Sequence, residues 1–545
     1  MDSAAGRAQA LADRWRATWE RSWARARAWV QARPRLEKGL QIAGHVVALA
    51  VTAAAFLTLN RRFYYWAIGY DEEFFAWGGW SITKGMVMYR DFIEFKPPLV
   101  FITHAIAQLL FGFRHGGYRK FFALFPLASV LSLQLSLTFR GLGRFLAMTA
   151  MLAVVVLFVN PTWHDTALSD SESIGLSYFM LGLAFLLWEG RYAKATLILG
   201  GFFMACCAMS KEPFGPTVVT TWLALFWVRG GETPSRSGRL FFARYSLYGV
   251  GALVVLLCAY MIPTGSMKAY IAMVSSYRAI YRDPAKSYCV VLGLAHPTGS
   301  RLGDLAVAWG KIRASFLNEA VLGYFTLLIV PGAAFALRRS KALFAMMLVV
   351  AVAALWAPTA TNCQWVHYYS MTMAGLILVM VASLDSIKGA LRAADPLVRR
   401  AATAGAFILV ILHGQPDFAR EWAAPYSRGP WSEPVPGVLA FIQQHTTPKD
   451  RIFTTGPPIL YPEANRRSAV RESNIIDEIL GSYPGATDEE RLRPLHDELV
   501  KHRPKVVVLD PENAYRKTRH YKSLIMPFLS ELHYQKINDN LYLLP

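Results

Sequence analysis

The sequence predicts a polytopic α-helical membrane protein that carries a C-terminal extracytoplasmic α/β domain. Of its 545 residues, 54% are hydrophobic and only 17% are charged, and the mean hydropathy is +0.28. Long apolar stretches alternate with short basic runs up to residue 413, whereas the remainder has mixed charge and no long apolar run. A chain of this composition is too apolar for an ordinary soluble protein, so we expect the bilayer to be its main solvent.

The charge pattern predicts the orientation of the chain. The net charge of +20 comes from basic residues placed between apolar stretches, which argues against a nucleic-acid partner and marks the cytoplasmic ends of spans. Residues 1–38 are basic and contain Trp but no early apolar core, so we expect a cytoplasmic amphipathic segment and no cleaved signal peptide. This segment either lies on anionic lipid or simply keeps the N-terminus inside.

A membrane domain is predicted over residues 39–413. The first span is expected at 40–60, and residues 61–120 then form an outer loop. Within that loop the apolar stretch 99–113 is short and contains polar residues, so we expect a membrane-surface helix there. Further spans are expected at 121–139, 145–159, 173–188, 195–209, 214–228, 245–263, 316–336, 342–357, 370–384 and 401–413, which makes about eleven in all with basic inward ends.

The tail, residues 414–545, is predicted to be a soluble α/β domain outside the cytoplasm. Strand-like runs occur at 451–455, 505–509 and 540–544, and residues 488–501 have helical spacing. Of the five cysteines, Cys206, Cys207 and Cys258 lie in apolar stretches. Cys289 and Cys363 fall in expected outer loops, which leaves one disulfide between them open.

The outer loop 61–120 concentrates charge beside the first span. Asp71 and Glu72 follow the first span, which ends at residue 60, and Glu94 and Lys96 precede a rigid Pro-Pro pair. Charges next to an apolar wall are costly to desolvate and usually mark function. A solvated loop at the membrane edge is the alternative interpretation.

The order of these motifs resembles the GT-C glycosyltransferases. It comprises an acidic pair after the first span, Gly-x-x-x-Tyr-Arg-Asp-Phe at 85–92, Lys-Pro-Pro-Leu at 96–99 and an acidic motif after the third span. The likeness is greatest to the branch that contains the protein O-mannosyltransferases and the lipid A aminoarabinose transferases. It covers residues 40–384 and, more loosely, the tail. It implies a GT-C-like fold and a transferase that uses a polyprenyl-phosphate-linked sugar and inverts its anomeric centre.

That resemblance also implies roles for individual residues. Asp71 is the expected general base for the acceptor hydroxyl, with Glu72 as the alternative. Cations are expected to bind the donor phosphate, although lysines and aromatic residues at span ends also serve as plain interface anchors. The expected phosphate-binding residues are Lys96, Arg119, Lys211, Arg278, Arg282, His367, Tyr368 and Tyr369.

A second acidic group is expected to orient the acceptor or to help bind a divalent metal ion. Its members are Asp91, Glu94, Asp170 and Glu172. The spacing is no metal signature and the resemblance leaves metal dependence open, so the candidate ligands are Glu94, Asp170, His296 and His367.

Three classes of function compete for this sequence. Charges at span ends and a large outer tail favour an enzyme over a transporter or lipid flippase, which tends to have interrupted helices and paired repeats. A receptor or scaffold leaves the charged loop without a role. We therefore expect a plasma (inner) membrane enzyme whose partners are a polyprenyl-phosphate-sugar, a lipid or glycan acceptor and membrane lipids, with a protein acceptor as the alternative.

Overall fold

The structure is a computed structural model. It describes residues 28–61, 70–94, 96–113, 116–159, 169–188, 192–229, 236–282, 341–356, 370–395, 401–410, 437–456, 458–471, 488–509 and 518–545, together with scattered residues at 14–25, at 329–338 and at 398.

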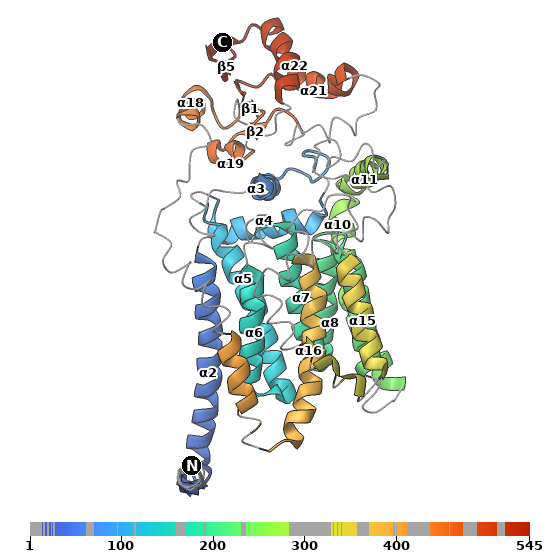
Figure 1. Ribbon diagram of the computed structural model, residues 1–545. Helices are drawn as coiled ribbons and strands as arrows, with labels where there is room; N and C mark the ends of the chain where they lie inside the picture. The colour runs from blue at the N-terminus through green and yellow to red at the C-terminus, as the bar shows by residue number, and fades with distance from the viewer. Residues whose placement is uncertain are drawn as a thin grey trace, which may run out of the picture.

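A bundle of apolar helices forms the body of the molecule (Figure 1). Within the described residues, four helices are long and apolar enough to cross a membrane, and several shorter apolar helices run beside them. The bundle comprises α2 (Pro34–Leu59), α5 (Arg119–Leu137), α6 (Arg144–Val159), α7 (Ser171–Leu187), α8 (Ala193–Ala208), α9 (Phe214–Arg229), α10 (Arg236–Met261), α15 (Lys341–Trp356), α16 (Ser370–Ala393) and the helix Ala401–Val410.

The outer faces of these helices are apolar as well as their inner faces. Val47 of α2 is 60% exposed, Val255 of α10 is 65% exposed and Leu348 of α15 is 56% exposed. Such faces are unfavourable in water and favourable in lipid, so the chain is a multi-pass membrane protein. The predicted spans from 40–60 to 245–263, and those at 342–357, 370–384 and 401–413, all fall on helices. The count of eleven stays a prediction, because most of the span expected at 316–336 lies outside the described residues.

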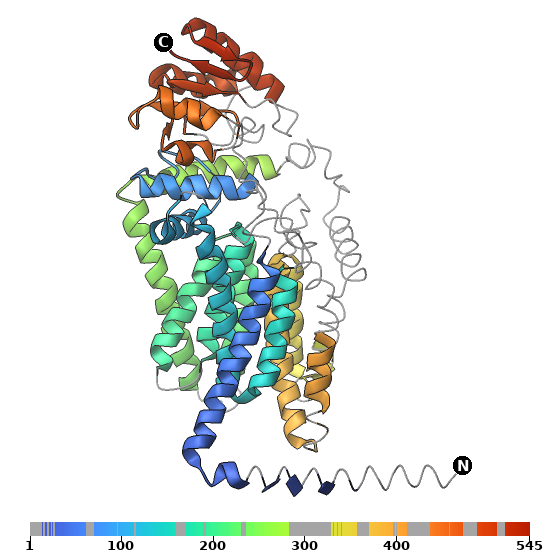
Figure 2. The same ribbon diagram turned by 90° about the vertical axis from the view of Figure 1, so that its left-hand side faces the viewer.

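Three further helices lie across the end of the bundle that is remote from the N-terminus (Figures 1 and 2). They are α3 (Tyr70–Thr83), α4 (Pro98–Phe111) and α11 (Ser266–Arg282). The helix predicted at 99–113 is confirmed by α4, and its place at the membrane surface stays a prediction. Its polar residues face the protein, since His104 contacts the Ser169 carbonyl at 2.9 Å and Gln108 donates to the Ala76 carbonyl at 2.7 Å.

The tail forms a separate layer beyond these transverse helices (Figure 2). Its five-stranded sheet has the order β2-β1-β3-β5-β4, with β1 parallel to β2 and β3, and β5 antiparallel to β3 and β4. The predicted α/β class is confirmed, and two strands, β2 and β4, were not predicted. The elements are α18 (Val438–His445), β1 (Arg451–Thr454), α19 (Leu460–Ala464), β2 (Arg467–Ser468), α21 (Asp488–His502), β3 (Val506–Val508), α22 (Thr518–Glu531), β4 (Gln535–Asn538) and β5 (Leu541–Leu543).

This α/β layer contacts α3 and the loop that follows it. The Ile93 amide donates to the Arg471 carbonyl at 2.9 Å, and the Arg467 guanidinium donates to the Lys84 carbonyl at 3.1 Å. The rings of Trp77 and Tyr461 lie 5.8 Å apart. The acidic start of α3 is therefore in a layer between the apolar bundle and the α/β domain.

Candidate active site

The first turn of α3 carries three consecutive carboxylates, Asp71, Glu72 and Glu73. Neighbouring residues on an α-helix point about 100° apart, so these side chains cannot share one environment. Glu72 is completely buried, whereas Asp71 is only partly buried. The helix thus places one carboxylate of the predicted acidic pair in the core and leaves the other partly exposed.

Glu72 forms a buried, bidentate ion pair with Arg119, the first residue of α5. The Arg119 Nε and Nη2 atoms donate to the two Glu72 carboxylate oxygens at 2.9 and 2.8 Å, and the Tyr118 hydroxyl donates at 3.1 Å. Burial alone would raise the pKa of Glu72, but the charge and hydrogen bonds of Arg119 outweigh it and hold that pKa below its ordinary value. Glu72 therefore fixes α3 to α5 as a carboxylate.

Lys211 and Glu172 form a second buried ion pair at the same end of the bundle. Lys211 lies in the turn between α8 and α9, and Glu172 lies in the first turn of α7, where the Ser171 hydroxyl donates to it at 2.6 Å. Burial lowers the pKa of Lys211, Glu172 opposes this shift, and the positive charge of Lys96 adds to it. The negative charge of Asp71 also acts on Lys211. The charges of Asp71, Lys96 and Glu172 thus all act on Lys211, and we call these four residues the outer cluster.

The Lys-Pro-Pro motif is held against Lys211 by the backbone. The Tyr89 hydroxyl donates to the Lys96 carbonyl at 2.7 Å, and the Leu99 amide donates to the Met209 carbonyl at 3.3 Å. These bonds join the loop before α4 to the turn after α8. Two lysines from distant parts of the sequence consequently lie together.

The remaining predicted acidic residues have different surroundings. Asp170 and Glu94 are 2% and 3% exposed, and Asp170 is the N-cap residue of α7, two positions before Glu172. Asp91 instead pairs with Arg90 at 2.8 Å and accepts from the Val87 amide at 2.8 Å. Its partner Arg90 donates to the Thr264 carbonyl at 3.2 Å, and Asp91 is not among the charges that act on Lys211.

Several predicted residues cannot be placed. His296, His367, Tyr368, Tyr369, Cys289 and Cys363 lie outside the described residues. Arg278 and Arg282 belong to α11, and their side chains are not described. Among the described residues, no group of three His, Cys, Asp or Glu side chains is arranged to hold a metal ion.

Sequence reasoning missed the helical state of residues 70–83 and the role of Tyr118 and His104. Burial lowers the pKa of His104 to about 4, so the ring is neutral at pH 7 and its Nε2–H donates to the Ser169 carbonyl, which is adjacent to Asp170. The ring centroids of His104 and Phe122 are 4.4 Å apart. A polar residue in the middle of an apolar surface helix was the available signal for this contact.

The arrangement has a defined chemical capacity. The partly buried Asp71 carboxylate and the Lys96 ammonium both act electrostatically on the Lys211 ammonium at the end of an apolar bundle. A carboxylate can accept a proton, and cations can stabilise a phosphate that gains charge as it leaves. Glu72 and Arg119 hold the helix that carries the carboxylate.

The chain shares its fold with solved structures of ArnT, in agreement with the motif resemblance. Among solved structures, the chain is similar to ArnT from Cupriavidus metallidurans in the apo state, with a TM-score of 0.52, 14% identity and coverage of 93% of this chain and 98% of that one. The same protein bound to undecaprenyl phosphate gives a TM-score of 0.51, 14% identity and coverage of 92% and 98%. No family model and no curated protein sequence matches the chain. These likenesses establish the fold.

Proposed function

We propose that this protein is a glycosyltransferase that moves a sugar from a polyprenyl-phosphate-linked donor to an acceptor outside the cytoplasm, an envelope lipid or glycan. The observation that carries the proposal is the outer cluster, in which the charges of Asp71 and Lys96 both act on the buried Lys211. The shared fold with ArnT, a structure of which is bound to undecaprenyl phosphate, supports this donor class.

The proposed reaction is a direct displacement at the anomeric carbon. The acceptor hydroxyl gives its proton to Asp71 while its oxygen bonds to the anomeric carbon. The bond from that carbon to the phosphate oxygen breaks, and the electron pair leaves with the polyprenyl phosphate. Attack from the face opposite the leaving group inverts the anomeric configuration.

Charge development explains the need for the two lysines. The leaving phosphate becomes more negative in the transition state, and ammonium groups held in place beforehand stabilise it without reorganisation. Lys96 and Lys211 supply two such groups from separate parts of the chain. The Glu172 carboxylate favours the charged form of Lys211, because it opposes the downward shift of the Lys211 pKa that burial causes.

A doubly labelled donor distinguishes this enzyme from a flippase. The purified full-length protein is reconstituted in vesicles with a polyprenyl-phosphate sugar labelled in both the sugar and the lipid. We expect the two labels to separate as the sugar joins an added lipid or glycan acceptor. Movement of both labels together across the bilayer, with no cleavage, would contradict the proposal and support the flippase.

The acceptor is tested in the same system. Envelope lipid, glycan and peptide acceptors are supplied separately, and the labelled product is identified by mass spectrometry. Labelled lipid or glycan is the expected product, whereas labelled peptide alone would assign the protein to the O-glycosylating alternative.

A further inference from the structure

A cavity lies at the opposite end of the bundle from the outer cluster. It has a volume of about 830 Å³ and is lined by residues of α2, of the π-helical turn η3 (Thr138–Leu142), of α6, of α16 and of the helix Ala401–Val410. Because α5 runs from Arg119 beside Glu72 to Leu137 beside this turn, the length of a span separates the two sites (Figure 1). The glycosyl-transfer proposal does not use this cavity.

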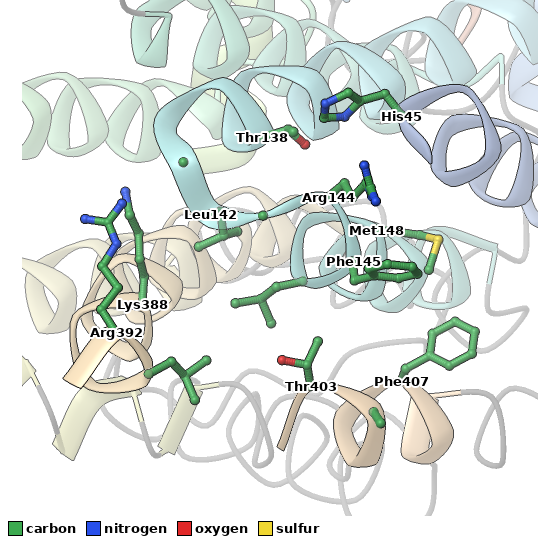
Figure 3. A pocket seen from close by; sticks show the side chains of 15 residues that line it. His45, Thr138, Leu142, Arg144, Phe145, Met148, Lys388, Arg392, Thr403 and Phe407 are labelled. Atoms are coloured by element: carbon green, nitrogen blue, oxygen red, sulfur yellow. The ribbon is translucent and has the colours of Figure 1, made fainter. Parts of the chain in front are cut away.

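Basic side chains line two walls of the cavity. Lys388 and Arg392, one turn apart on α16, lie side by side on one wall, and Arg144 with His45 lies on the other (Figure 3). Among the described lining residues there is no carboxylate. The nearby Asp385 is paired with Arg140 at 3.1 Å, outside the lining. The cavity is therefore suited to an anionic group.

The turn between α5 and α6 shapes this basic wall. Gly141 and Gly143 have φ angles of 77° and 88°. Residues with a Cβ rarely adopt such angles, so glycine allows the chain to reverse direction here. The Lys388 ammonium donates to the Arg140 carbonyl and closes the turn. A Cβ on Gly141 would lie 3.3 Å from the Arg392 guanidinium and 3.5 Å from the Lys388 ammonium.

Apart from Thr138 and Thr403, the remaining lining is apolar. Leu142, Phe145, Leu146, Met148, Leu391 and Phe407 complete the walls. Phe145 is 59% exposed, so this part of the lining leaves apolar surface for lipid chains to cover. An inorganic anion would leave this apolar part empty, whereas a molecule with both an anionic head and alkyl chains would fill both parts.

We propose that this cavity binds one acidic membrane phospholipid, with its phosphate between the two basic walls and part of its acyl chains against the apolar lining. The charge of the walls selects an anionic headgroup, and α6, which begins at Arg144, directs the positive end of its dipole to the same region. The basic N-terminal segment has the wrong charge to occupy this cavity.

The test counts lipids on the purified full-length protein. The protein is prepared in detergent with phosphatidylcholine, phosphatidylglycerol of the same chain length is titrated in, and retained lipids are resolved by native mass spectrometry. We expect one tightly retained phosphatidylglycerol. Equal retention of phosphatidylcholine, or displacement by glycerol phosphate without chains, would overturn the proposal.

Two variants locate the site. Lys388→Gln with Arg392→Gln keeps a donor for the Arg140 carbonyl but removes two charges, and it should weaken phosphatidylglycerol binding about 25-fold. The matched control, Arg338→Gln with Lys341→Gln, removes two exposed charges that do not line the cavity and should leave binding unchanged. Equal losses of phosphatidylglycerol binding in the two double variants would show that the effect comes from general surface charge, and would overturn the proposal.

A third variant tests the apolar part without a change of charge. Ala404→Trp places a large side chain in the cavity from the helix Ala401–Val410. It should abolish retention of the phospholipid while the thermal unfolding measured in phosphatidylcholine stays close to that of the wild type. Retention at the wild-type level would place the bound lipid elsewhere.

Discussion

Asp71 and Glu72 are neighbours in the sequence, yet the helix gives them different tasks. Glu72 has no exposed surface and both of its carboxylate oxygens are bound by Arg119, so Glu72 would have to lose a bidentate ion pair to accept a proton from a substrate. Asp71 is partly buried and acts electrostatically on Lys211. Burial therefore favours Asp71 as the proton acceptor and Glu72 as the residue that positions its helix.

The structural task of Glu72 predicts a pH dependence of stability. Glu72→Gln leaves Arg119 buried without its countercharge and should cost about 3 kcal/mol at pH 7. The pKa of Glu72 is lowered in the folded protein. The contribution of its carboxylate to folding stability is therefore complete above the ordinary glutamate pKa, and it is lost as the pH falls through the lowered pKa of the folded state. The difference in melting temperature between wild type and variant should therefore stay constant down to about pH 4.5 and narrow below it.

The double variant Glu72→Gln with Arg119→Gln is the control for this pair. It removes both charges and should recover part of the lost stability. A double variant that loses the sum of the two single effects would show that the two residues act independently.

Lys211 is predicted to stabilise the donor phosphate as well as the folded protein. Lys211→Met leaves Glu172 buried and uncompensated, so this variant should lose both stability and transfer. Adding Glu172→Gln should restore much of the melting temperature but not the transfer rate, because the cation near the phosphate is still missing. Recovery of transfer in the double variant would limit Lys211 to a structural role.

At the scale of elements, the segments predicted correctly are those whose hydrophobic pattern follows directly from where they are buried. The long apolar stretches and α4 correspond to observed helices, and β1, β3 and β5 lie within predicted strand-like runs. The helix α3 was missed because Phe75, Trp77 and Trp80 are buried on several sides, which leaves no amphipathic period to detect. Strand β2 spans two residues, and β4 is exposed along its whole length, so neither has a strand pattern.

The candidate site was predictable in its residue types and less so in its pairings. Motif order singled out Asp71, Lys96 and Lys211, and topology placed them at one end of the bundle. The pairing of Glu72 with Arg119 depends on how α3 packs across α5, and contact between residues so distant in sequence has no local signal. Asp91 illustrates the same limit, because only the folded loop shows that it pairs with Arg90.

The packing of α3 on α4 gives a prediction about positioning. A Cβ on Gly79 would lie 2.7 Å from the Ala105 backbone nitrogen and 2.6 Å from the His104 Cβ. Gly79→Ala must therefore push α3 away from α4, which should cost roughly 1–3 kcal/mol and reduce transfer by displacing Asp71. Gly215→Ala is the matched control, since nothing lies within 4 Å of its Cβ position. Equal activity of the two variants would show that the α3–α4 contact does not position the site.

At the scale of the whole molecule, the N-terminus and the α/β domain lie at opposite ends of the bundle (Figure 1). Together with the basic loops, this predicts that tags at Arg236 and Arg392 face the cytoplasm, whereas Asp71, Asp170 and the tail face outward. Cysteine labelling of intact cells with a membrane-impermeant reagent measures this arrangement. Protection of a tag in the tail from this reagent, together with labelling at Arg236, would show that the orientation is the reverse of the predicted one.

The most direct test of the account is the rate of sugar transfer by Asp71→Asn. This variant keeps the size of the side chain and removes the proton acceptor, so turnover of the polyprenyl-phosphate donor should fall by about 10² to 10⁴ while donor binding and membrane insertion persist. Glu73→Gln is the control on the same helical turn, because the Glu73 charge acts on Tyr118 and is not among those that act on Lys211. A transfer rate for Asp71→Asn within a few-fold of the wild-type rate would contradict the proposed mechanism.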